Sequence, residues 1–270
     1  MSTPQLSLQL YTVNQALSAD LPGTLARVAG LGFRNVEAFA FVGRAAEVRA
    51  AQDATGLVSP SGHAPFLSDQ VGLPGNLVDA PPVEQVLDDA ATMGVELLID
   101  PMTAPERWAS RDEVAKTAER LNEVAALAAG RGIRVGYHNH AQEFHHSFDG
   151  VTAYETFVAQ LDPAVVLELD AYWAAVGGQD VPGLVARLGD RVKALHVKDG
   201  STGYDPFKTG DFDPVRLGQV VAGTGEVPLT AALDAASALE LAVVEYDAAP
   251  GDVFEAIAGT QAFLADRGIR

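Results

Sequence analysis

The residues of this chain best suited to chemistry are histidines and carboxylates at the ends of short apolar runs. The segment YHNHAQEFHH holds four of the six histidines, at positions 138, 140, 145 and 146, together with Glu143. Asp170, His196 and Glu245 lie at the ends of VVLELD, ALHV and VVE. Carboxylate oxygens and imidazole nitrogens are ligands with which proteins hold divalent metal ions, so we expect metal chemistry here.

Eight apolar runs alternate along the chain with segments of helical period. The runs are LSLQLYT, NVEAFA, LVSPSGHA, VELLIDPM, IRVGYHNH, VVLELD, VKALHVKD and LAVVEYD. The helical segments cover 21–31, 45–55, 83–93, 111–131, 151–161, 181–188, 229–239 and 252–267. Eight strands, each followed by a helix, predict an α/β fold that is a single (β/α)₈ TIM barrel over residues 1–270.

Glycine positions agree with this alternation. Gly32, Gly56, Gly94 and Gly132 each follow a predicted helix and precede the next apolar run. Glycine tolerates the left-handed conformation that ends many helices. A doubly wound open sheet is the alternative, but it usually carries a glycine-rich phosphate loop after its first strand, and the sequence reads YTVNQALSADLPG there.

Barrels of this kind build their active sites at the carboxyl ends of the strands. Strand side chains alternate between faces, so His138 and His140 are expected to project together, as are Glu168 with Asp170, His196 with Lys198, and Glu245 with Asp247. Carboxylates gathered at one depth repel one another unless a cation is present. Two long connections that follow strands, 66–82 and 200–224, are candidates for substrate lids or binding walls, although inert insertions are equally compatible.

Composition narrows the compartment and the partners. The chain has no cysteine, so thiolate metal sites and disulfides are excluded. A formal charge of −18 disfavours nucleic acid, which binds basic surfaces. With neither a basic segment leading into an apolar run at the start nor a long apolar stretch elsewhere, we expect a cytoplasmic protein with no membrane partner.

Taken in order, these motifs resemble the sugar phosphate isomerase/epimerase group of xylose-isomerase-like barrels. The resemblance covers nearly the whole chain and is carried by LSLQLYTV, GFRNVEAF, SGHAPF, YHNHAQEF, LELDAYWAAVGG, ALHVKDG, GTGEVPL and VVEYD. It implies one divalent metal ion, such as Mn²⁺, Mg²⁺, Co²⁺ or Zn²⁺, held by two glutamates, an aspartate and a histidine. Matching motifs place Asp170, His196 and Glu245 in three of these roles.

The fourth ligand is less direct, because many relatives read ENH in the fifth strand where this chain reads HNH. Glu143 is the preferred candidate, since a carboxylate preserves the ligand set that the resemblance implies. His138 is the alternative, and two imidazoles would shift the site toward zinc, iron or cobalt. If Glu143 is the ligand, His138 joins the substrate-binding residues.

The resemblance also implies a reaction: proton removal beside the carbonyl of a keto sugar or related polyol, through an enediolate that the metal stabilises. Glu143 and Glu245 are the predicted catalytic bases. Epimerisation or isomerisation is the leading outcome, and a dehydratase or lyase acting on an inosose or keto sugar is the alternative. A sugar-binding barrel without catalysis is less favoured. An apurinic endonuclease is disfavoured by the negative charge.

Substrate contacts are expected from polar residues at other strand ends and from aromatic side chains near them. The candidates are His63, His138, His140 and Lys198, with Trp173 and Phe66 as possible apolar walls. Lys198 is equally suited to an ion pair with a neighbouring carboxylate. No Arg/Lys cluster with a glycine-rich turn indicates a phosphate cradle, so a non-phosphorylated substrate is favoured. Homo-oligomers are common in the group that the chain resembles.

Overall fold

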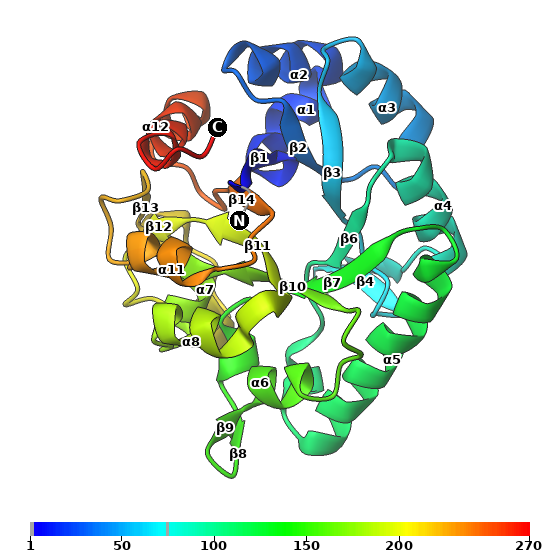
Figure 1. Cartoon of the computed structure of the whole chain (residues 1–270), viewed down its shortest axis with the longest axis vertical. Helices are drawn as coiled ribbons and strands as arrows, with labels where there is room; N and C mark the ends of the chain where they lie inside the picture. The colour runs from blue at the N-terminus through cyan, green and yellow to red at the C-terminus, as the bar shows by residue number, and fades with distance from the viewer. Residues whose placement is uncertain (1–2, 74–75) are drawn as a thin grey trace.

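A computed structural model describes residues 3–73 and 76–270, and its centre is a closed barrel of eight parallel strands (Figure 1). The strands are β1 (Gln5–Gln9), β2 (Asn35–Ala38), β3 (Val58–His63), β6 (Leu97–Asp100), β7 (Arg134–His138), β10 (Val166–Asp170), β11 (Val192–Val197) and β14 (Leu241–Val244). Their order around the barrel is β1-β14-β11-β10-β7-β6-β3-β2. The predicted (β/α)₈ TIM barrel is confirmed.

Helices surround the strands on the outside (Figure 1). They are α2 (Leu21–Gly30), α3 (Ala45–Asp53), α4 (Val83–Met93), α5 (Arg111–Ala129), α6 (Ala153–Val158), α8 (Val181–Leu188), α11 (Leu229–Ala235) and α12 (Val253–Ala265). Each corresponds to a predicted helix. The glycines at 32, 56, 94 and 132 all have positive φ, as the helix-ending interpretation requires. No helix in the described part of the chain is long and apolar enough to cross a membrane.

Helix α6 is shorter than the predicted helix 151–161. Its first two residues belong instead to a small hairpin of β8 (Ser147–Phe148) and β9 (Val151–Thr152). Asp149 and Gly150 form the turn, and both have positive φ. Thr152 then caps α6, because its hydroxyl accepts a hydrogen bond from the backbone N–H of Glu155 at 3.1 Å.

The barrel interior has an apolar lower layer and a polar upper layer. Leu97, Ile99, Val166, Ala194, Leu241 and Val243 form a separate apolar cluster inside the strands. The next inward positions toward the carboxyl ends, two residues further along the same strands, carry Glu168, His196 and Glu245. Gly136 leaves room for this packing, because a Cβ there would lie 2.7 Å from Ile99 Cδ1. Alternation along the strands therefore places a packed apolar layer below a polar layer at the carboxyl ends. This polar layer, with Glu168, His196 and Glu245, is called the floor of the site below.

Short elements follow several strands and surround the carboxyl ends. They are η1 (Leu10–Val13), α1 (Asn14–Ala19), η2 (Pro105–Trp108), η3 (Gln142–Phe144), α7 (Ala171–Val176), α9 (Pro206–Thr209) and α10 (Pro214–Leu217), whereas η4 (Gly189–Arg191) links α8 to the start of β11. The first long connection contains an antiparallel hairpin of β4 (Gln70–Leu73) and β5 (Asn76–Asp79). The second contains α9, α10 and the pair β12 (Asp199–Gly200) and β13 (Gln219–Val220).

Candidate metal centre and substrate cavity

Four side chains from neighbouring strands meet at the polar floor of the barrel. His138, Asp170, His196 and Glu245 each offer one ligand atom, and these atoms all lie within 4.8 Å of one another. Strand register explains the meeting, because Asp170 pairs with His196 between β10 and β11. The structure thus brings together three of the four predicted metal ligands, with His138 as the fourth member of the group.

Asp170 is held in place by the helix that follows its strand. Its Oδ1 accepts a hydrogen bond from the backbone N–H of Trp173 at 2.7 Å, which caps α7. The backbone N–H of Asp170 also donates to Asn139 Oδ1 at 2.9 Å, which ties the end of β10 to the residue after β7. The second oxygen, Oδ2, is left facing the cluster, buried and without a well-directed hydrogen bond from any described residue.

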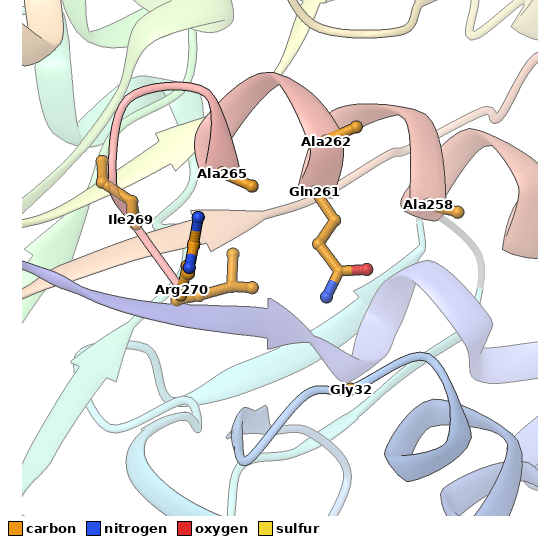
Figure 2. Close-up of a pocket in the computed structure, with 8 residues that line it drawn as sticks. Gly32, Ala258, Gln261, Ala262, Ala265, Ile269 and Arg270 are labelled. Atoms are coloured by element: carbon orange, nitrogen blue, oxygen red, sulfur yellow. The ribbon is translucent and has the colours of Figure 1, made fainter.

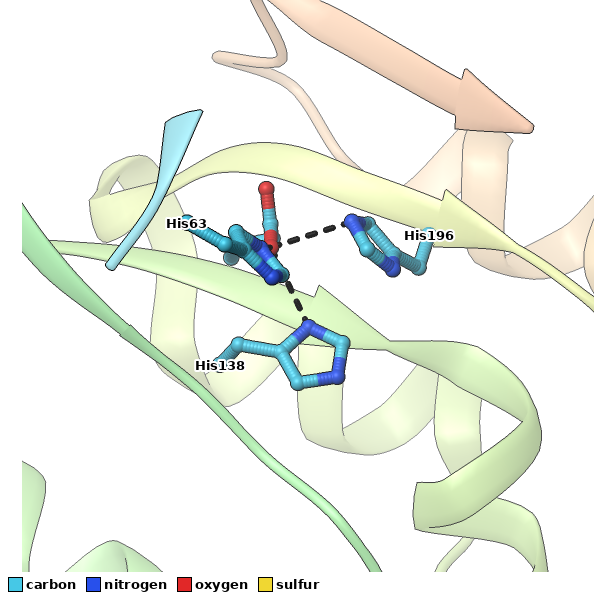
Figure 3. A group of neighbouring side chains, drawn as sticks. His63, His138 and His196 are labelled. Atoms are coloured by element: carbon cyan, nitrogen blue, oxygen red, sulfur yellow. Dashed lines mark hydrogen bonds and ion pairs between the residues drawn. The ribbon is translucent and has the colours of Figure 1, made fainter. Parts of the chain in front are cut away.

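The imidazoles of His63, His138 and His196 converge from three strands (Figure 3), and the carboxylate of Glu168 belongs to the same close group. Glu168 Oε1 lies 3.1 Å from His138 Nδ1 and 3.0 Å from His196 Nε2. Glu37 Oε1 also lies 2.8 Å from His196 Nε2. When those nitrogens donate, His138 Nε2 and His196 Nδ1 are left to face Asp170 and Glu245. Glu168 and Glu37 then form an outer layer of carboxylates, of the kind that commonly orients metal-binding histidines.

Lys198 lies fully buried beside the same group. Its Nζ lies 3.0 Å from Asp170 Oδ2 and 2.8 Å from both Glu245 Oε2 and Asp247 Oδ2. The ion pair expected as one role for Lys198 is therefore present. One ammonium group faces three carboxylates here, so the cluster keeps excess negative charge that a further cation would offset.

Glu143 lies outside the four-residue group. Its Oε1 accepts a hydrogen bond from the Tyr137 hydroxyl at 2.8 Å, and its Oε2 accepts one from the backbone N–H of His140, also at 2.8 Å. Burial raises the pKa of Glu143 to about 7. The geometry gives this residue a role in fixing the turn after β7, since both of its oxygens are engaged there.

Electrostatics sets the charge of the residues around the floor. Burial disfavours charge on Glu245, but Lys198 and His196 outweigh it and hold the pKa of this carboxyl well below its usual range. Burial lowers the pKa of the His140 imidazole to about 3, with a contribution from Lys198. Glu245 is therefore ionised at neutral pH and His140 is neutral.

Two further groups have displaced pKa values. Burial raises the pKa of Asp170 to about 6, although Lys198 and His196 oppose the shift. Burial also disfavours charge on His63, but the carboxylates of Glu37 and Glu168 outweigh it and raise the pKa of His63 to about 10. Such opposed shifts within one cleft are typical of functional sites.

A cavity of about 990 Å³ opens above this floor. The predicted contact residues His63, His138, His140 and Trp173 line it, and so does Glu245. Lys198 and Phe66 are buried and are not among its lining residues. Both long connections contribute walls, the first through residues 71, 78, 79 and 81 and the second through Phe207 and Phe212.

A second hollow, of about 380 Å³, lies between α12 and the start of β1 (Figure 2). Gln261 and Arg270 are the polar side chains among its described lining residues, which are otherwise small or apolar. It contains neither an imidazole nor a carboxylate among those residues. The chemistry therefore belongs to the carboxyl ends of the strands.

Sequence reasoning assigned no role to three residues that the structure places in the site. Glu37 and Glu168 hold the imidazoles, and Asp247 pairs with Lys198. All three were visible as polar residues at strand ends, the signal that could have identified them. Their contacts could not be predicted, because each carboxylate meets an imidazole from a strand that is distant in the sequence.

Residues 25–264 match the family described as xylose isomerase-like TIM barrel, and the chain belongs to this family. Among solved structures, the chain is similar to a sugar phosphate isomerase/epimerase from Parabacteroides distasonis. The two are 22% identical with a TM-score of 0.75, over 98% of this chain and 94% of that one. No curated protein matches the chain.

Two other similar structures carry different activities in their names. One is a D-allulose 3-epimerase from Methylomonas sp., at 14% identity and a TM-score of 0.68, over 99% of both chains. The other is a probable 3-DHS dehydratase involved in petrobactin synthesis from Bacillus anthracis, at 14% identity and a TM-score of 0.70, over 97% of this chain and 99% of that one. At these identities the likeness establishes the fold.

Proposed function

We propose that this chain is a metal-dependent isomerase or epimerase of a keto sugar or related polyol, which acts by removing a proton beside the substrate carbonyl. One observation carries the proposal. His138, Asp170, His196 and Glu245 converge within 4.8 Å, and two of them, His138 and Glu245, line a cavity large enough for such a substrate. Membership of the xylose isomerase-like family supports the same class of reaction.

The residues present fit a divalent metal ion. Asp170 Oδ2 is buried, faces the cluster and lacks a well-directed hydrogen bond, and Glu245 Oε2 lies 2.6 Å from His196 Nδ1. We assign the ion to His138, Asp170, His196 and Glu245, with His138 in place of the expected Glu143. Two imidazoles and two carboxylates suit zinc, cobalt or manganese. When bound, the ion acts as a Lewis acid that polarises the substrate carbonyl.

The chain's own residues supply the proton transfer. Glu245 lines the cavity as an ionised carboxylate, and we assign it as the group that accepts a proton from the carbon beside the carbonyl because of this position. Lys198 Nζ, 2.8 Å from Glu245 Oε2, fixes the position of that carboxylate. His140 lines the cavity with a neutral ring, and we assign it a hydrogen bond to a substrate hydroxyl.

Glu143 takes a positioning role in this proposal rather than the catalytic one expected from the sequence. Its carboxyl group holds the backbone of His140 and the Tyr137 hydroxyl, and it does not line the cavity. A base that returns the proton on the opposite face must come from a lining residue or from solvent. Asp247 lines the cavity but shares the Lys198 ammonium group with Glu245, which places it on the same side as Glu245.

The test is metal analysis of the purified protein followed by NMR in D₂O with a panel of keto sugars and inososes. We expect about one divalent ion per chain and deuterium incorporation at the carbon next to the carbonyl. Glu245→Gln should abolish incorporation, whereas Glu255→Gln, on the exposed face of α12, should not. Exchange by Glu245→Gln at the parent rate would contradict the assignment of the base.

The same spectra separate the alternative reactions. A product with deuterium and all hydroxyl groups retained identifies an isomerase or epimerase. Loss of water from the substrate identifies a dehydratase, an activity named for one structure of the same fold. Binding of metal and sugar without exchange across the whole panel would favour a sugar-binding barrel.

A further inference from the structure

The cavity above the candidate metal centre changes character from its floor to its mouth. The floor presents imidazoles and carboxylates, whereas the walls above are largely aromatic and aliphatic. None of the described residues that line it is a lysine or arginine. Its volume of about 990 Å³ is at the upper end of the range, about 300–1,000 Å³, in which proteins enclose drug-sized ligands. One sugar ring leaves much of this space unfilled.

Two aromatic walls face each other across this space. Tyr11 and Phe39 pack edge to face with their ring centroids 5.2 Å apart, and Trp173 and Phe207 do the same at 5.3 Å. The first pair follows β1 and β2, while Trp173 follows β10, the strand diametrically opposite β2 in the closed order of eight. Trp173 itself is fully buried, so a flat apolar group that enters the mouth meets Phe207 on one side and Tyr11 and Phe39 on the other.

Apolar side chains continue to the rim of the cavity. Val78 is 57% exposed, Phe212 is 52% exposed and Met102 is 47% exposed, and all three line the cavity. Exposed apolar surface gathered around a hollow favours an apolar occupant, because covering it removes that surface from water. The aromatic pairs line the hollow and not a flat face of the molecule. A small ligand that enters the hollow can therefore cover them better than a second copy of the chain can.

We propose that the substrate is a keto sugar that carries an aryl or similarly sized apolar group, for example as an aryl glycoside, an inference that rests on the proposed function. The sugar oxygens meet the imidazoles and carboxylates of the floor, and the apolar group lies between the aromatic walls. A free polyol end would lose hydrogen bonds to water against these walls. A phosphate group would meet Asp79 and find no cation among the described lining residues.

Isothermal titration calorimetry with two ligands that differ only in the apolar group tests this inference. The probes are the 4-nitrophenyl and methyl β-D-glucopyranosides in their 3-keto forms. We expect the 4-nitrophenyl ligand to bind at least tenfold more tightly, equivalent to about 1.4 kcal/mol. Phe207→Ala should reduce this preference to within twofold, and Phe212→Ala, at an exposed position, should reduce it about threefold. Phe263→Ala removes the same ring from α12, outside the cavity, and should preserve the preference.

Equal affinity of the parent for the two ligands would overturn the inference. Binding of glucose 6-phosphate more tightly than the 4-nitrophenyl ligand would overturn it as well. The parent could instead show no aryl preference and sediment as a dimer that the Phe212→Asp substitution dissociates. This result would identify the rim as a subunit interface and would also overturn the inference. Binding is measured without turnover. A chain that prefers the aryl ligand but never exchanges deuterium would therefore refute the proposed reaction and leave this inference standing.

Discussion

Glu143 provides a quantitative test of how burial acts in this barrel. The carboxyl group is fully buried, and burial raises its pKa from the ordinary value of 4.5 to about 7. The folded chain therefore binds a proton more tightly than the unfolded chain between these two pH values. As a result, the contribution of Glu143 to the free energy of unfolding falls as pH rises through this window.

The size of the effect follows from the two pKa values. Each pKa unit corresponds to about 1.4 kcal/mol, so the full difference is about 3 kcal/mol. Roughly 2.5 kcal/mol of this is lost between pH 5 and pH 8, because the unfolded carboxyl is already partly ionised at pH 5. Other buried carboxyl groups contribute to the total pH dependence, so a variant is needed to isolate this one.

Glu143→Gln removes the titration and retains most of the side-chain volume. It loses one of two hydrogen bonds, since an amide has a single acceptor oxygen for Tyr137 and His140, and this should cost about 1–3 kcal/mol at every pH. Urea unfolding at pH 5 and pH 8 should show the parent losing roughly 2.5 kcal/mol more than the variant across the interval. Glu119→Gln, at an exposed site on α5, should follow the parent. Parallel profiles for the parent and Glu143→Gln would refute the burial argument.

Three further outcomes are expected. Lys198→Met leaves Asp170, Glu245 and Asp247 without their shared ammonium group. The free energy of unfolding of the metal-free protein, measured in urea, should therefore fall by about 3–5 kcal/mol. A fall of less than about 1 kcal/mol would contradict the ion-pair assignment. Glu168→Gln should weaken Mn²⁺ binding about 10- to 100-fold in calorimetry, because Glu168 contacts two of the proposed ligand imidazoles, and unchanged affinity would exclude this orienting role. Mn²⁺ at 100 times its dissociation constant should raise the free energy of unfolding by about 2.7 kcal/mol, whereas Asp170→Asn should reduce this gain at the same Mn²⁺ concentration.

The local sequence was sufficient to predict the barrel. The strand and helix periods, together with the glycines after the helices, predict the order of the elements. Eight consecutive strand–helix units are typical of a closed parallel barrel, which the structure has. The period of two also predicted that Glu168 and Asp170 would point into the barrel together, as they do. These properties depend on residues close in sequence, which is why they could be predicted.

Some short elements were not predicted. The β4–β5 hairpin and the hairpin before α6 are made of strands of only two to four residues, too short for an alternating pattern to be recognised. Helix α7 (Ala171–Val176) is capped by Asp170, whose type and place at a strand end had suggested a metal ligand only. In the proposed site, one oxygen of this carboxyl group caps the helix and the other is left for the metal.

The proposal of His138 rather than Glu143 as a metal ligand rests on the tertiary structure. From the sequence, both lie near the end of one strand, and Glu143 offered the more familiar ligand. In the fold, the turn after β7 directs both Glu143 oxygens to Tyr137 and to the His140 backbone, while His138 stays on the inward face of the strand beside Asp170.

The sequence by itself determined which residue types reach the carboxyl ends of the strands, because alternation along a strand is a local property. The tertiary structure decided which of them meet, because closure of the barrel places β2, β3 and β11 side chains within hydrogen-bond distance of one another. Glu37 and His196 are separated by 159 residues, and their contact at 2.8 Å follows from packing across the barrel. Burial of these groups, which sets their pKa values, likewise exists only once the barrel is closed.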